Sequence, residues 1–538
     1  MTKIRTDVLV VGGGLAGLCA AISSSSDQSE TLIVTKTLVG DATTTSMAAG
    51  VISAVTAYGD SEDSVEKHLN DTLAGGANVN DKMLARAMVY DASKYFERLL
   101  ELGIEFEGET MPRVNFIPGH SKPRSYVIKG KGIGLQHILR NAVMALGTKV
   151  MERTLITSLV KDGQRVVGAI GYSLEHNEIV EIKAKSTILA TGGPGELYSR
   201  TLMPTGSTGY GPSLGFRAGA ELVDMEFVQF YPTMVYEEAL PRLFIDYSPL
   251  LRQGGDILDE DGVSVFKKEN IDEPYKLKRD AFSLLLAKET IKENGHEKRI
   301  FLDCTRIKKG EIASNPMLSS HVEDLQSKRV PILERKIGIS PYAHFFMGGF
   351  RADANGATTL LGLYVAGESM GGPHGANRIG GNAFAAAVSF GFRSGLAASL
   401  YSSTVEDPTE DAFDGPLCTV KNVLGDSGQI EASSIRRHIQ DIMWEKVGLI
   451  RTRKGLEDAI IKLNSIREKA PSSKNPLDRL LIPMMIDTAE AVTLSAMVRE
   501  ESRGAHYRLD FPIALPEWQK RVVLKMKENE CIVEFVPV

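Results

Sequence analysis

The first residues whose types and spacing suggest chemistry are the glycines of Gly12-Gly13-Gly14-Leu15-Ala16-Gly17. Gly12 permits a tight turn, Gly14 lets the backbone approach a pyrophosphate, and Gly17 permits close packing of a helix on a strand. The free amides and the dipole at the start of that helix would stabilise phosphate charge. The spacing therefore predicts a dinucleotide site near the N-terminus.

A second stretch, GLYVAGESMGGPHGANRIGG (residues 362–381), places Glu368, His374, Asn377 and Arg378 among glycines. A guanidinium between glycines in a loop has few structural reasons to be there. The loop leads into the helix-like sequence NAFAAAVSFGFRSG, so its backbone N–H groups can point at a bound group such as a flavin ring carbonyl. We expect this loop to bind ligand.

Short apolar strands must position these loops. DVLVV (residues 7–11) precedes the first glycines, and STILATGGPG (residues 186–195) is another buried strand that ends in a glycine turn. The strand TLIVTK ends at Thr35 and Lys36 without the acidic residue that usually holds an adenosine ribose. That omission argues against a plain NAD site.

The order of these segments predicts an α/β fold with an interrupted Rossmann-like domain. The domain occupies residues 1–233 and 345–400, and an inserted α+β capping domain occupies residues 234–344. A polar, proline-bearing linker is expected at 401–427, a helical domain at 428–504, where apolar residues recur at helical spacing, and a short C-terminal tail at 505–538.

Composition excludes several classes of function. The 538 residues carry a net charge of −6, with no basic face for nucleic acid or anionic lipid. The four cysteines are far apart and form no CxxC, so we expect no metal site, no iron–sulfur cluster and no disulfide framework on this chain, and a reducing cytoplasm fits best. We expect no run long enough to span a bilayer and no direct membrane insertion.

The motifs GGGLAG, ATGGPG, MEFVQFYPT, YKLKRD, AHFFMGG, AGESMGGPHGANRIGGN and REESRGAHYRLDFP occur in this order. Together they resemble the succinate dehydrogenase/fumarate reductase flavoprotein family, which includes L-aspartate oxidase. The resemblance covers nearly the whole chain and implies FAD as the cofactor. The tail PEWQKRVVLKMKENECIVEFVPV is more similar to the dehydrogenase/reductase branch than to the oxidase.

The resemblance also implies roles for individual residues. Arg378 and His344 match the pair that binds a substrate carboxylate, and Arg279 matches the arginine that donates a proton during reduction or accepts one during oxidation. His374 is a further substrate ligand or a loop anchor. The residues expected to bind FAD are Gly12, Gly14, Leu15, Ala16, Gly17, Thr35, Lys36, Thr44, Thr45, Ala49, Gly50, Ala190, Thr191, Gly192, Glu368, Arg378, Gly381, Asn382 and Ala383.

Two departures from the family concern the cofactor. Thr44 stands where members with covalent flavin have a histidine, so the FAD is expected to be non-covalent, with a potential that favours reduction. Tyr210 in TGYG replaces an acid that contacts the cofactor in relatives. An altered contact is expected there.

The larger departures concern the substrate. Tyr231 in MEFVQFYPT replaces a histidine, and Tyr247-Ser248 replaces a Thr-Glu pair that holds a second carboxylate and relays protons. The relay arginine aligns with Leu251, and Arg252 is one residue further on. Neutral phenols hold a carboxylate less well than charged donors. Either the substrate has a bulkier, less polar far end, or Tyr231, Tyr247 and Arg252 rebuild a diacid site.

Three functions follow. The first is an FAD-dependent enoate reductase or succinate-type dehydrogenase that acts on a small carboxylate and exchanges electrons with an iron–sulfur subunit, in the cytoplasm or at the inner face of the membrane through partners. The second is an L-aspartate oxidase. The third is a flavin electron-relay subunit without substrate chemistry, which the joint presence of Arg279, His344 and Arg378 disfavours.

Overall fold

A computed structural model describes residues 1–27, 29–108, 111–115, 117–290, 297–425, 431–469, 473–528 and 530–538. The chain forms two compact units. Unit 1 comprises Met1–Ser199, Met203–Val228 and Phe345–Val538, and unit 2 comprises Arg200–Leu202 and Gln229–His344. The parts of the predicted linker and helical domain at 426–430 and 470–472 lie outside the described residues.

The main sheet of unit 1 has the strand order β6-β2-β1-β9-β8-β7, and β16 also pairs with β9. Its central strands β2, β1, β9 and β16 are parallel, whereas β7, β8 and β9 pair antiparallel. The strands are β1 (Thr2–Val11), β2 (Thr31–Val34), β6 (Lys149–Met151), β7 (Thr154–Asp162), β8 (Arg165–Ser173), β9 (Glu178–Leu189) and β16 (Leu363–Val365). The carboxyl ends of β1, β9 and β16 therefore meet at one edge, where α/β sheets bind ligands.

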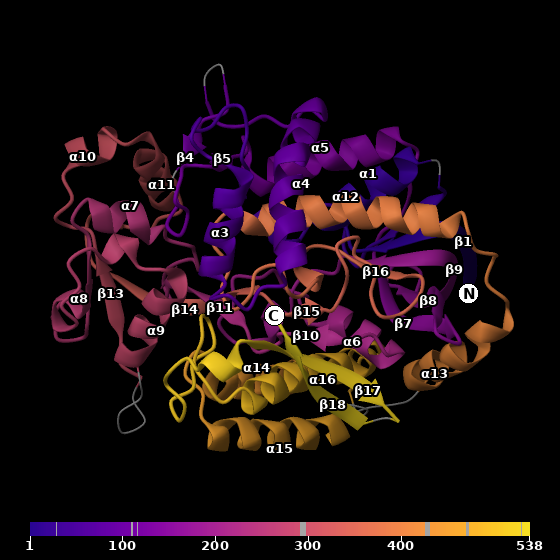
Figure 1. Cartoon of the computed structure of the whole chain (residues 1–538). Coiled ribbons are helices and arrows are strands. Elements are labelled where there is room, and N and C mark those ends of the chain that lie inside the picture. The colour runs from indigo at the N-terminus through magenta and orange to yellow at the C-terminus, as the bar shows by residue number, and fades with distance from the viewer. Residues whose placement is uncertain are drawn as a thin grey trace. The chain divides into compact units, whose positions relative to one another are not determined.

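Helices cover this sheet, and α1 packs against α12 (Figure 1). Small residues allow this close approach, because a Cβ added at Gly391 would lie 2.7 Å from the Ala16 carbonyl oxygen and one at Gly395 would lie 2.2 Å from that of Ala20. The helices of this part of unit 1 are α1 (Leu15–Ser26), α2 (Thr44–Met47), α3 (Val65–Gly75), α4 (Lys82–Glu101), α5 (Lys131–Ala145) and α12 (Asn382–Ser402), and α4 packs on α12. A small sheet, β3-β5-β4, consists of Val51–Ser53, Ser125–Val127 and Val114–Asn115.

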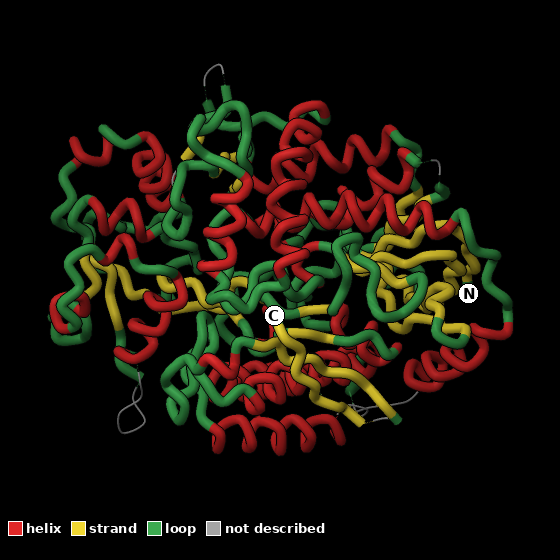
Figure 2. Tube along the Cα trace, in the orientation of Figure 1, coloured by secondary structure: helices red, strands yellow, loops and turns green. Residues whose placement is uncertain are grey.

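The C-terminal part of unit 1 is mainly helical. Its helices pack around α16, next to a sheet in the order β15-β10-β17-β18 that ends in a hairpin (Figure 2). The helices are α6 (Tyr210–Ala218), α13 (Asp414–Gly425), α14 (Ala432–Val447), α15 (Arg453–Lys469) and α16 (Pro476–Val498), and the strands are β10 (Leu222–Val223), β15 (Gly349–Phe350), β17 (Lys520–Lys527) and β18 (Glu530–Pro537). The stretch 401–427, expected to be a linker, contains helix α13. The helix forms there because its apolar face, with Leu417 and Val420, packs against Val160 and Val167 of the main sheet.

Two helices, α12 and α16, are long and apolar enough to cross a membrane by length and composition. The expectation that no segment would be long enough is therefore wrong. Their most apolar windows are 67% and 61% buried inside the fold, which is how core helices of this length satisfy the same test.

Unit 2 has its own sheet, in the order β11-β14-β13-β12, and its own apolar core. The strands are β11 (Val228–Val235), β12 (Asp256–Leu258), β13 (Ile300–Asp303) and β14 (Ile337–Phe346), and the helices are α7 (Tyr247–Arg252), α8 (Val265–Lys268), α9 (Arg279–Glu289), α10 (Lys309–Ala313) and α11 (Pro316–Ser327). Short 3-10 turns occur at Gly195–Leu197, Pro274–Lys276, Gly367–Ser369, Asp411–Phe413 and Pro516–Trp518.

Candidate active site

The N-terminal glycine loop has the backbone contacts expected of a dinucleotide cradle. A Cβ added at Gly12 would lie 2.2 Å from the Ala190 carbonyl oxygen, and one at Gly17 would lie 2.0 Å from the Gly12 carbonyl oxygen. Gly12 also has φ +119°, which disfavours a side chain. The backbone at the ends of β1 and β9 is thus close enough that only glycine fits at both positions.

The residues around this cradle fit a bound FAD. Helix α1 begins after Gly14, which has no side chain to cap it, and the Thr45 hydroxyl accepts from the Leu15 N–H at 3.2 Å. Gly192, with φ +75°, faces open space, and the buried Thr208 hydroxyl has no hydrogen-bond partner among the described residues. Amides at a helix start without a side-chain cap and an unpartnered hydroxyl suit a phosphate-bearing ligand.

Lys36 and Tyr210 meet beside this cradle. The Lys36 Nζ donates to the Gly206 carbonyl oxygen and lies 5.0 Å from the centre of the Tyr210 ring. Burial lowers the pKa of Lys36 to about 8, with Glu196 opposing the shift. Tyr210, which replaces a cofactor-contacting acid, therefore faces the cation with the π-system of its ring.

The segment around Thr44 forms the short helix α2. Thr43 caps it by accepting from the Ser46 N–H, and the Thr44 hydroxyl donates to Met203 Sδ at 3.1 Å. Ala49 is exposed, whereas Gly50 is buried with φ +74°, and a Cβ there would lie 2.7 Å from the Lys131 Cα. A threonine hydroxyl offers no imidazole for a covalent flavin link, so non-covalent FAD remains our prediction.

Glu368 lies against the glycine turn that follows β9. Its Oε1 accepts from the Phe346 N–H at 2.9 Å, and a Cβ added at Gly193 would lie 2.3 Å from the same oxygen. The Thr191 and Ser369 hydroxyls are 3.1 Å apart. Burial raises the pKa of Glu368 to about 7. The structure thus brings the second glycine-rich loop and the ATGGPG turn together.

The start of α12 is held by residues that no motif indicated. The Asn382 side chain is 2.9 Å from His68 Nε2 and donates to the Thr72 hydroxyl at 2.9 Å, while His120 Nε2 is 2.8 Å from the Gly380 carbonyl oxygen. Asn382 therefore uses its amide to fix the loop. His68 and His120 are core histidines, and burial lowers their pKa values to about 3 and about 4.

Arg378 and His374 flank one aromatic ring. The Arg378 guanidinium lies 4.6 Å from the centre of the Phe345 ring, and the His374 ring meets the same ring edge-on at 5.2 Å. Arg378 is 5% exposed. Burial, together with the charge of Arg378, lowers the pKa of His374 to about 3, so His374 is a neutral hydrogen-bonding group.

The loop that carries Arg378 is held from two sides. The Ala376 N–H donates to the Gly76 carbonyl oxygen at 2.9 Å, and the Ala505 N–H donates to the Ala376 carbonyl oxygen at 2.9 Å. A Cβ added at Gly504 would lie 2.6 Å from that oxygen. The Arg503 Nη1 also donates to the Ala77 carbonyl oxygen at 3.2 Å. The distal RGAH segment, which sequence reasoning gave no role, therefore clamps the Arg378 loop.

A buried charge network anchors this distal segment. Arg499 pairs with Glu226 at 2.6 Å and with Glu501 at 3.0 Å, and all three side chains are fully buried. The Arg451 Nη1 donates to the Glu226 carbonyl oxygen at 2.7 Å. Glu226 belongs to the start of MEFVQFYPT, so the first residues of this motif and REESRGAHYR meet in the core of unit 1.

Unit 2 gathers four of the predicted site residues. The Arg279 guanidinium lies 5.3 Å from the centre of the Tyr231 ring, and the Tyr231 ring lies 5.4 Å from His344 and 5.8 Å from Tyr247. Phe244 packs on the same ring at 4.4 Å. The cluster is aromatic and cationic.

Arg252 is not part of this cluster. It is exposed and lies 5.1 Å from the Tyr275 ring, whereas the Ser248 hydroxyl donates to the Tyr275 carbonyl oxygen at 3.4 Å. The geometry gives no support to Arg252 as a replacement for the family's relay arginine.

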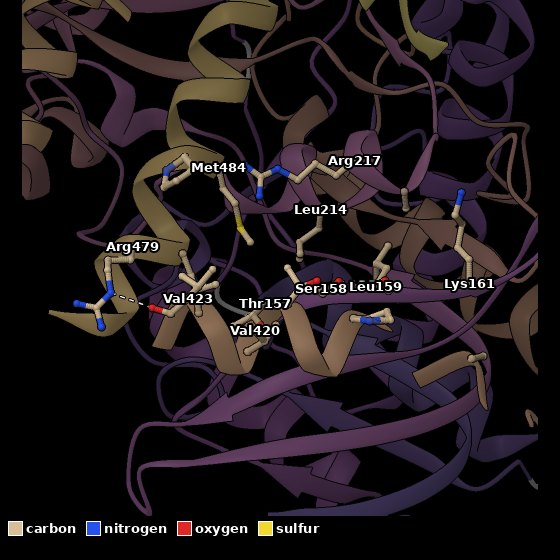
Figure 3. Close-up of a pocket in the computed structure, with 16 residues that line it drawn as sticks. Thr157, Ser158, Leu159, Lys161, Leu214, Arg217, Val420, Val423, Arg479 and Met484 are labelled. Carbon is tan, nitrogen blue, oxygen red and sulfur yellow. Dashed lines mark hydrogen bonds between the residues drawn. The ribbon is translucent and has the colours of Figure 1, made fainter. Parts of the chain in front are cut away.

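The predicted residues fall on both units. The FAD set, His374 and Arg378 belong to unit 1, and Tyr231, Tyr247, Arg252, Arg279 and His344 belong to unit 2. A separate cavity of about 640 Å³ in unit 1, between β7, α6, α13 and α16, is lined by Leu159, Leu214, Val420 and Met484 among others and by none of these residues (Figure 3).

The fold and the glycine loops define an FAD-dependent oxidoreductase. A model described as "FAD binding domain" matches residues 7–384, and one described as "Fumarate reductase flavoprotein C-term" matches residues 436–538. The chain belongs to the fumarate reductase/succinate dehydrogenase flavoprotein family, acts on CH–CH bonds and uses FAD, so the predicted family, α/β fold class and cofactor are confirmed.

Known relatives match over nearly the whole chain. It is 34% identical to a fumarate reductase (CoM/CoB) subunit of Methanothermobacter marburgensis, with 97% of each chain covered. It is 28% identical to L-aspartate oxidase of Streptomyces coelicolor, over 98% of this chain and 93% of the relative. The structure of Mycobacterium smegmatis Sdh1 superposes with a TM-score of 0.89 at 25% identity, covering 100% of this chain and 95% of that one.

Proposed function

We propose that this protein interconverts an enoate and the corresponding saturated carboxylate, with reduction as the favoured direction. The observation that supports the proposal most directly is that the guanidinium of Arg279 in unit 2 lacks a fixed acidic partner in the part of the chain that the structure describes. Its Nη1 is buried without a hydrogen-bond partner among the described residues, and no ion pair of Arg279 is found among them. An arginine without a fixed acidic partner is available to a reacting group.

The residues of each unit have separate tasks in this reaction. FAD supplies two-electron transfer to or from the carbon–carbon bond. In unit 1, Arg378 binds a carboxylate through its planar fork, and the neutral His374 adds a hydrogen bond. In unit 2, Arg279 donates a proton to carbon, and His344 adds a donor for a carboxylate.

The aromatic cluster limits the far end of the substrate. Tyr231 is 1% exposed, and burial raises its pKa well above its ordinary value, with Asp246 adding to the shift. Burial also raises the pKa of Tyr247 to about 12. Both phenols are therefore neutral, and a neutral donor contributes roughly half as much to holding a carboxylate as a charged one. We propose a monocarboxylate enoate with an apolar or aromatic far end, and fumarate is the diacid alternative.

Electrons must leave or reach the flavin through another protein. Two relatives are named as subunits, one of a fumarate reductase (CoM/CoB) and one the fumarate reductase flavoprotein subunit of Mycobacterium tuberculosis. Within the described residues no group of three or more His, Cys, Asp or Glu side chains could hold a metal ion. An iron–sulfur subunit therefore completes the proposed enzyme, in the cytoplasm or at the inner face of the membrane.

L-aspartate oxidase is the second candidate, favoured by full-length similarity to enzymes of that name. L-aspartate carries two carboxylates, and the neutral Tyr231 and Tyr247 hold the second one poorly. Anaerobic bleaching of the flavin by L-aspartate would support this candidate.

The test is reoxidation of the flavin. The purified protein is reduced with dithionite, and its absorbance near 450 nm is followed with fumarate, alkyl-substituted enoates and arylacrylates in turn. We expect an apolar enoate to reoxidise the flavin faster than fumarate does. Reoxidation by a dye but by no enoate would refute the proposal and favour an electron-relay subunit.

Tyr231→His tests the specificity argument, with Tyr231→Phe as its matched control. The histidine variant should gain activity towards fumarate, because a protonated imidazole supplies a charged donor. The phenylalanine variant should not. If neither variant changes the ratio of fumarate to arylacrylate rates, Tyr231 does not determine the substrate.

A further inference from the structure

Arg378 is followed by Ile379 and then by two consecutive glycines, Gly380 and Gly381, before α12 begins. Glycine has the most flexible backbone of all residues, so this stretch does not hold its own shape. The Arg378 guanidinium is tied to it, because its Nη1 donates to the Ile379 carbonyl oxygen at 3.3 Å. A fixed position of Arg378 therefore requires contacts that hold the two glycines from outside the loop.

A histidine far away in the sequence supplies one such contact. His120 Nε2 lies 2.8 Å from the Gly380 carbonyl oxygen, and His120 is 4% exposed. The residue before it, Gly119, leaves room for the Ile379 side chain, because a Cβ there would lie 2.9 Å from Ile379 Cγ2. Both residues therefore support the segment directly after Arg378.

Arg124 determines which nitrogen of His120 carries the proton. The Arg124 Nη1 lies 3.0 Å from His120 Nδ1, and a guanidinium nitrogen can only donate. Nδ1 is therefore the acceptor, and the proton of the neutral ring is on Nε2, the nitrogen that faces the Gly380 carbonyl oxygen. The other tautomer would turn a lone pair towards that oxygen.

Two acids of unit 1 orient Arg124. Asp63 pairs with it bidentately, with Nη2 and Nε at 2.7 Å and 2.9 Å from its two carboxylate oxygens. Asp71 accepts from Nη1 and also from the Ser121 N–H at 2.8 Å. The Arg124 and Asp63 side chains are buried. A buried bidentate pair fixes the plane of the guanidinium, which aims Nη1 at His120.

We propose that His120 is a positioning residue for Arg378. Arg124, oriented by Asp63, holds the imidazole in the tautomer that donates to the loop, so each donor in this series meets an acceptor. The inference rests on the proposed role of Arg378 in binding a substrate carboxylate. It adds that this role depends on a hydrogen bond from His120 to the Gly380 carbonyl oxygen.

A second donor to the same oxygen provides a matched control. The Ser53 hydroxyl lies 3.2 Å from the Gly380 carbonyl oxygen and 3.3 Å from His120 Nε2. The Ser53 N–H donates to the Gly381 carbonyl oxygen at 3.3 Å. Ser53→Ala removes the longer of the two bonds to Gly380 and keeps both the backbone bond and the bond from His120.

The tautomer is tested directly by the ¹⁵N chemical shifts of histidine-labelled holoenzyme near neutral pH. The signal that is lost in His120→Gln identifies His120 among the ten histidines. We expect a protonated Nε2 and an unprotonated Nδ1. In Arg124→Lys, which keeps the charge but not the planar fork, the signal should change to a mixture of tautomers. A wild-type His120 with its proton on Nδ1, or on both nitrogens, would overturn the proposal.

The effect on Arg378 is tested by binding of succinate and of a saturated monocarboxylate, read from the flavin spectrum. His120→Leu offers no donor and should weaken the affinity by about tenfold or more. His120→Gln, which offers one donor and one acceptor, should stay within about threefold of the wild type. Ser53→Ala should also stay within about threefold. The flavin content should be unchanged in all three variants.

This comparison separates positioning from packing. If His120 only filled the core, leucine would be tolerated at least as well as glutamine, because burying an amide costs more than burying an apolar side chain. If His120→Leu fails to fold, His120→Asn takes its place, since its shorter side chain does not reach the Gly380 carbonyl oxygen. The asparagine variant should then show the tenfold loss expected for leucine.

Equal affinities in His120→Leu and His120→Gln, or a greater loss in Ser53→Ala than in His120→Leu, would overturn the proposal while leaving the role of Arg378 standing. A wild-type protein that binds no saturated carboxylate would instead refute the proposed function, whereas the tautomer of His120 is measured without any substrate.

Discussion

Gly504→Ala tests the clamp on the Arg378 loop. The added Cβ would lie 2.6 Å from the Ala376 carbonyl oxygen and 2.7 Å from the Ala376 Cβ, both closer than real Cβ atoms come. Gly504 also has φ +54°, where a side chain is strained. Either the Arg503–His506 turn or the Arg378 loop must move, because the atoms in contact belong to the backbone or lie next to it.

The expected loss of unfolding free energy in Gly504→Ala has two contributions. Placing an alanine in the left-handed region costs about 1–2 kcal/mol. Forcing extra volume into a packed site costs typically about 1–3 kcal/mol. We therefore expect the free energy of unfolding to fall by about 2–5 kcal/mol, the sum of these terms.

Two other glycines separate the contributions. Gly147 has φ +72° but no heavy atom within 4 Å of an added Cβ, so Gly147→Ala should show the conformational cost alone, about 1–2 kcal/mol. Gly310 lies in α10 with open space around the added Cβ, and no positive φ is recorded for it, so Gly310→Ala should be neutral or stabilising by up to about 1 kcal/mol. Urea unfolding of the three variants under one condition gives the comparison.

The functional readout is binding of a saturated carboxylate, followed by its effect on the flavin spectrum. A displacement of the Arg378 loop by about 1 Å should lower kcat/KM by as much as about 10²-fold, with FAD still bound. If Gly504→Ala destabilises the protein no more than Gly147→Ala and binds the carboxylate with wild-type affinity, the clamp is not what positions Arg378.

Three further predictions concern the cofactor and the proton donor. Arg279→Ala should abolish turnover and leave the flavin content unchanged, and normal turnover in this variant would remove Arg279 from the mechanism. Acid precipitation should release all the flavin into the supernatant, because Thr44 offers no imidazole for a covalent bond; flavin retained in the pellet would contradict this. Burial raises the pKa of Glu368 to about 7, above its unfolded value, so the stability that this group contributes is present at low pH and lost as the pH rises through 7. In flavin-free protein, the unfolding free energy of the wild type should therefore fall between about pH 4.5 and pH 7.5 by on the order of 3 kcal/mol more than that of Glu368→Gln, and parallel pH profiles would refute the assignment.

The flavin loops could be predicted from the sequence because their signal is local. Gly12 and Gly17 are required by contacts with backbone atoms of neighbouring segments, and glycine is the one residue without the Cβ that would collide there. The same reasoning indicated Glu368 and Arg378 among glycines. Each of these positions lies within a short, contiguous motif and can therefore be recognised from the sequence alone.

The clamp on the Arg378 loop could not be predicted in this way. The bond between Ala505 and Ala376 joins two backbone groups far apart in the chain, and a backbone amide carries no residue-specific signal.

Arg252 shows the opposite error. Its place one residue beyond the family's relay position suggested a shifted replacement, but a shift of one residue on a short helix turns a side chain to another face. In the structure that face is exposed and the guanidinium rests on Tyr275.

The contacts of Ala376 also set an order of events during biosynthesis. Its N–H bonds to Gly76, which leaves the ribosome early, and its carbonyl oxygen bonds to Ala505, which leaves late. A nascent chain that has released all the flavin-binding glycines still lacks the second hold on the Arg378 loop. The segments that form the flavin-binding glycine loops are therefore synthesised before the segment that completes the hold on the Arg378 loop.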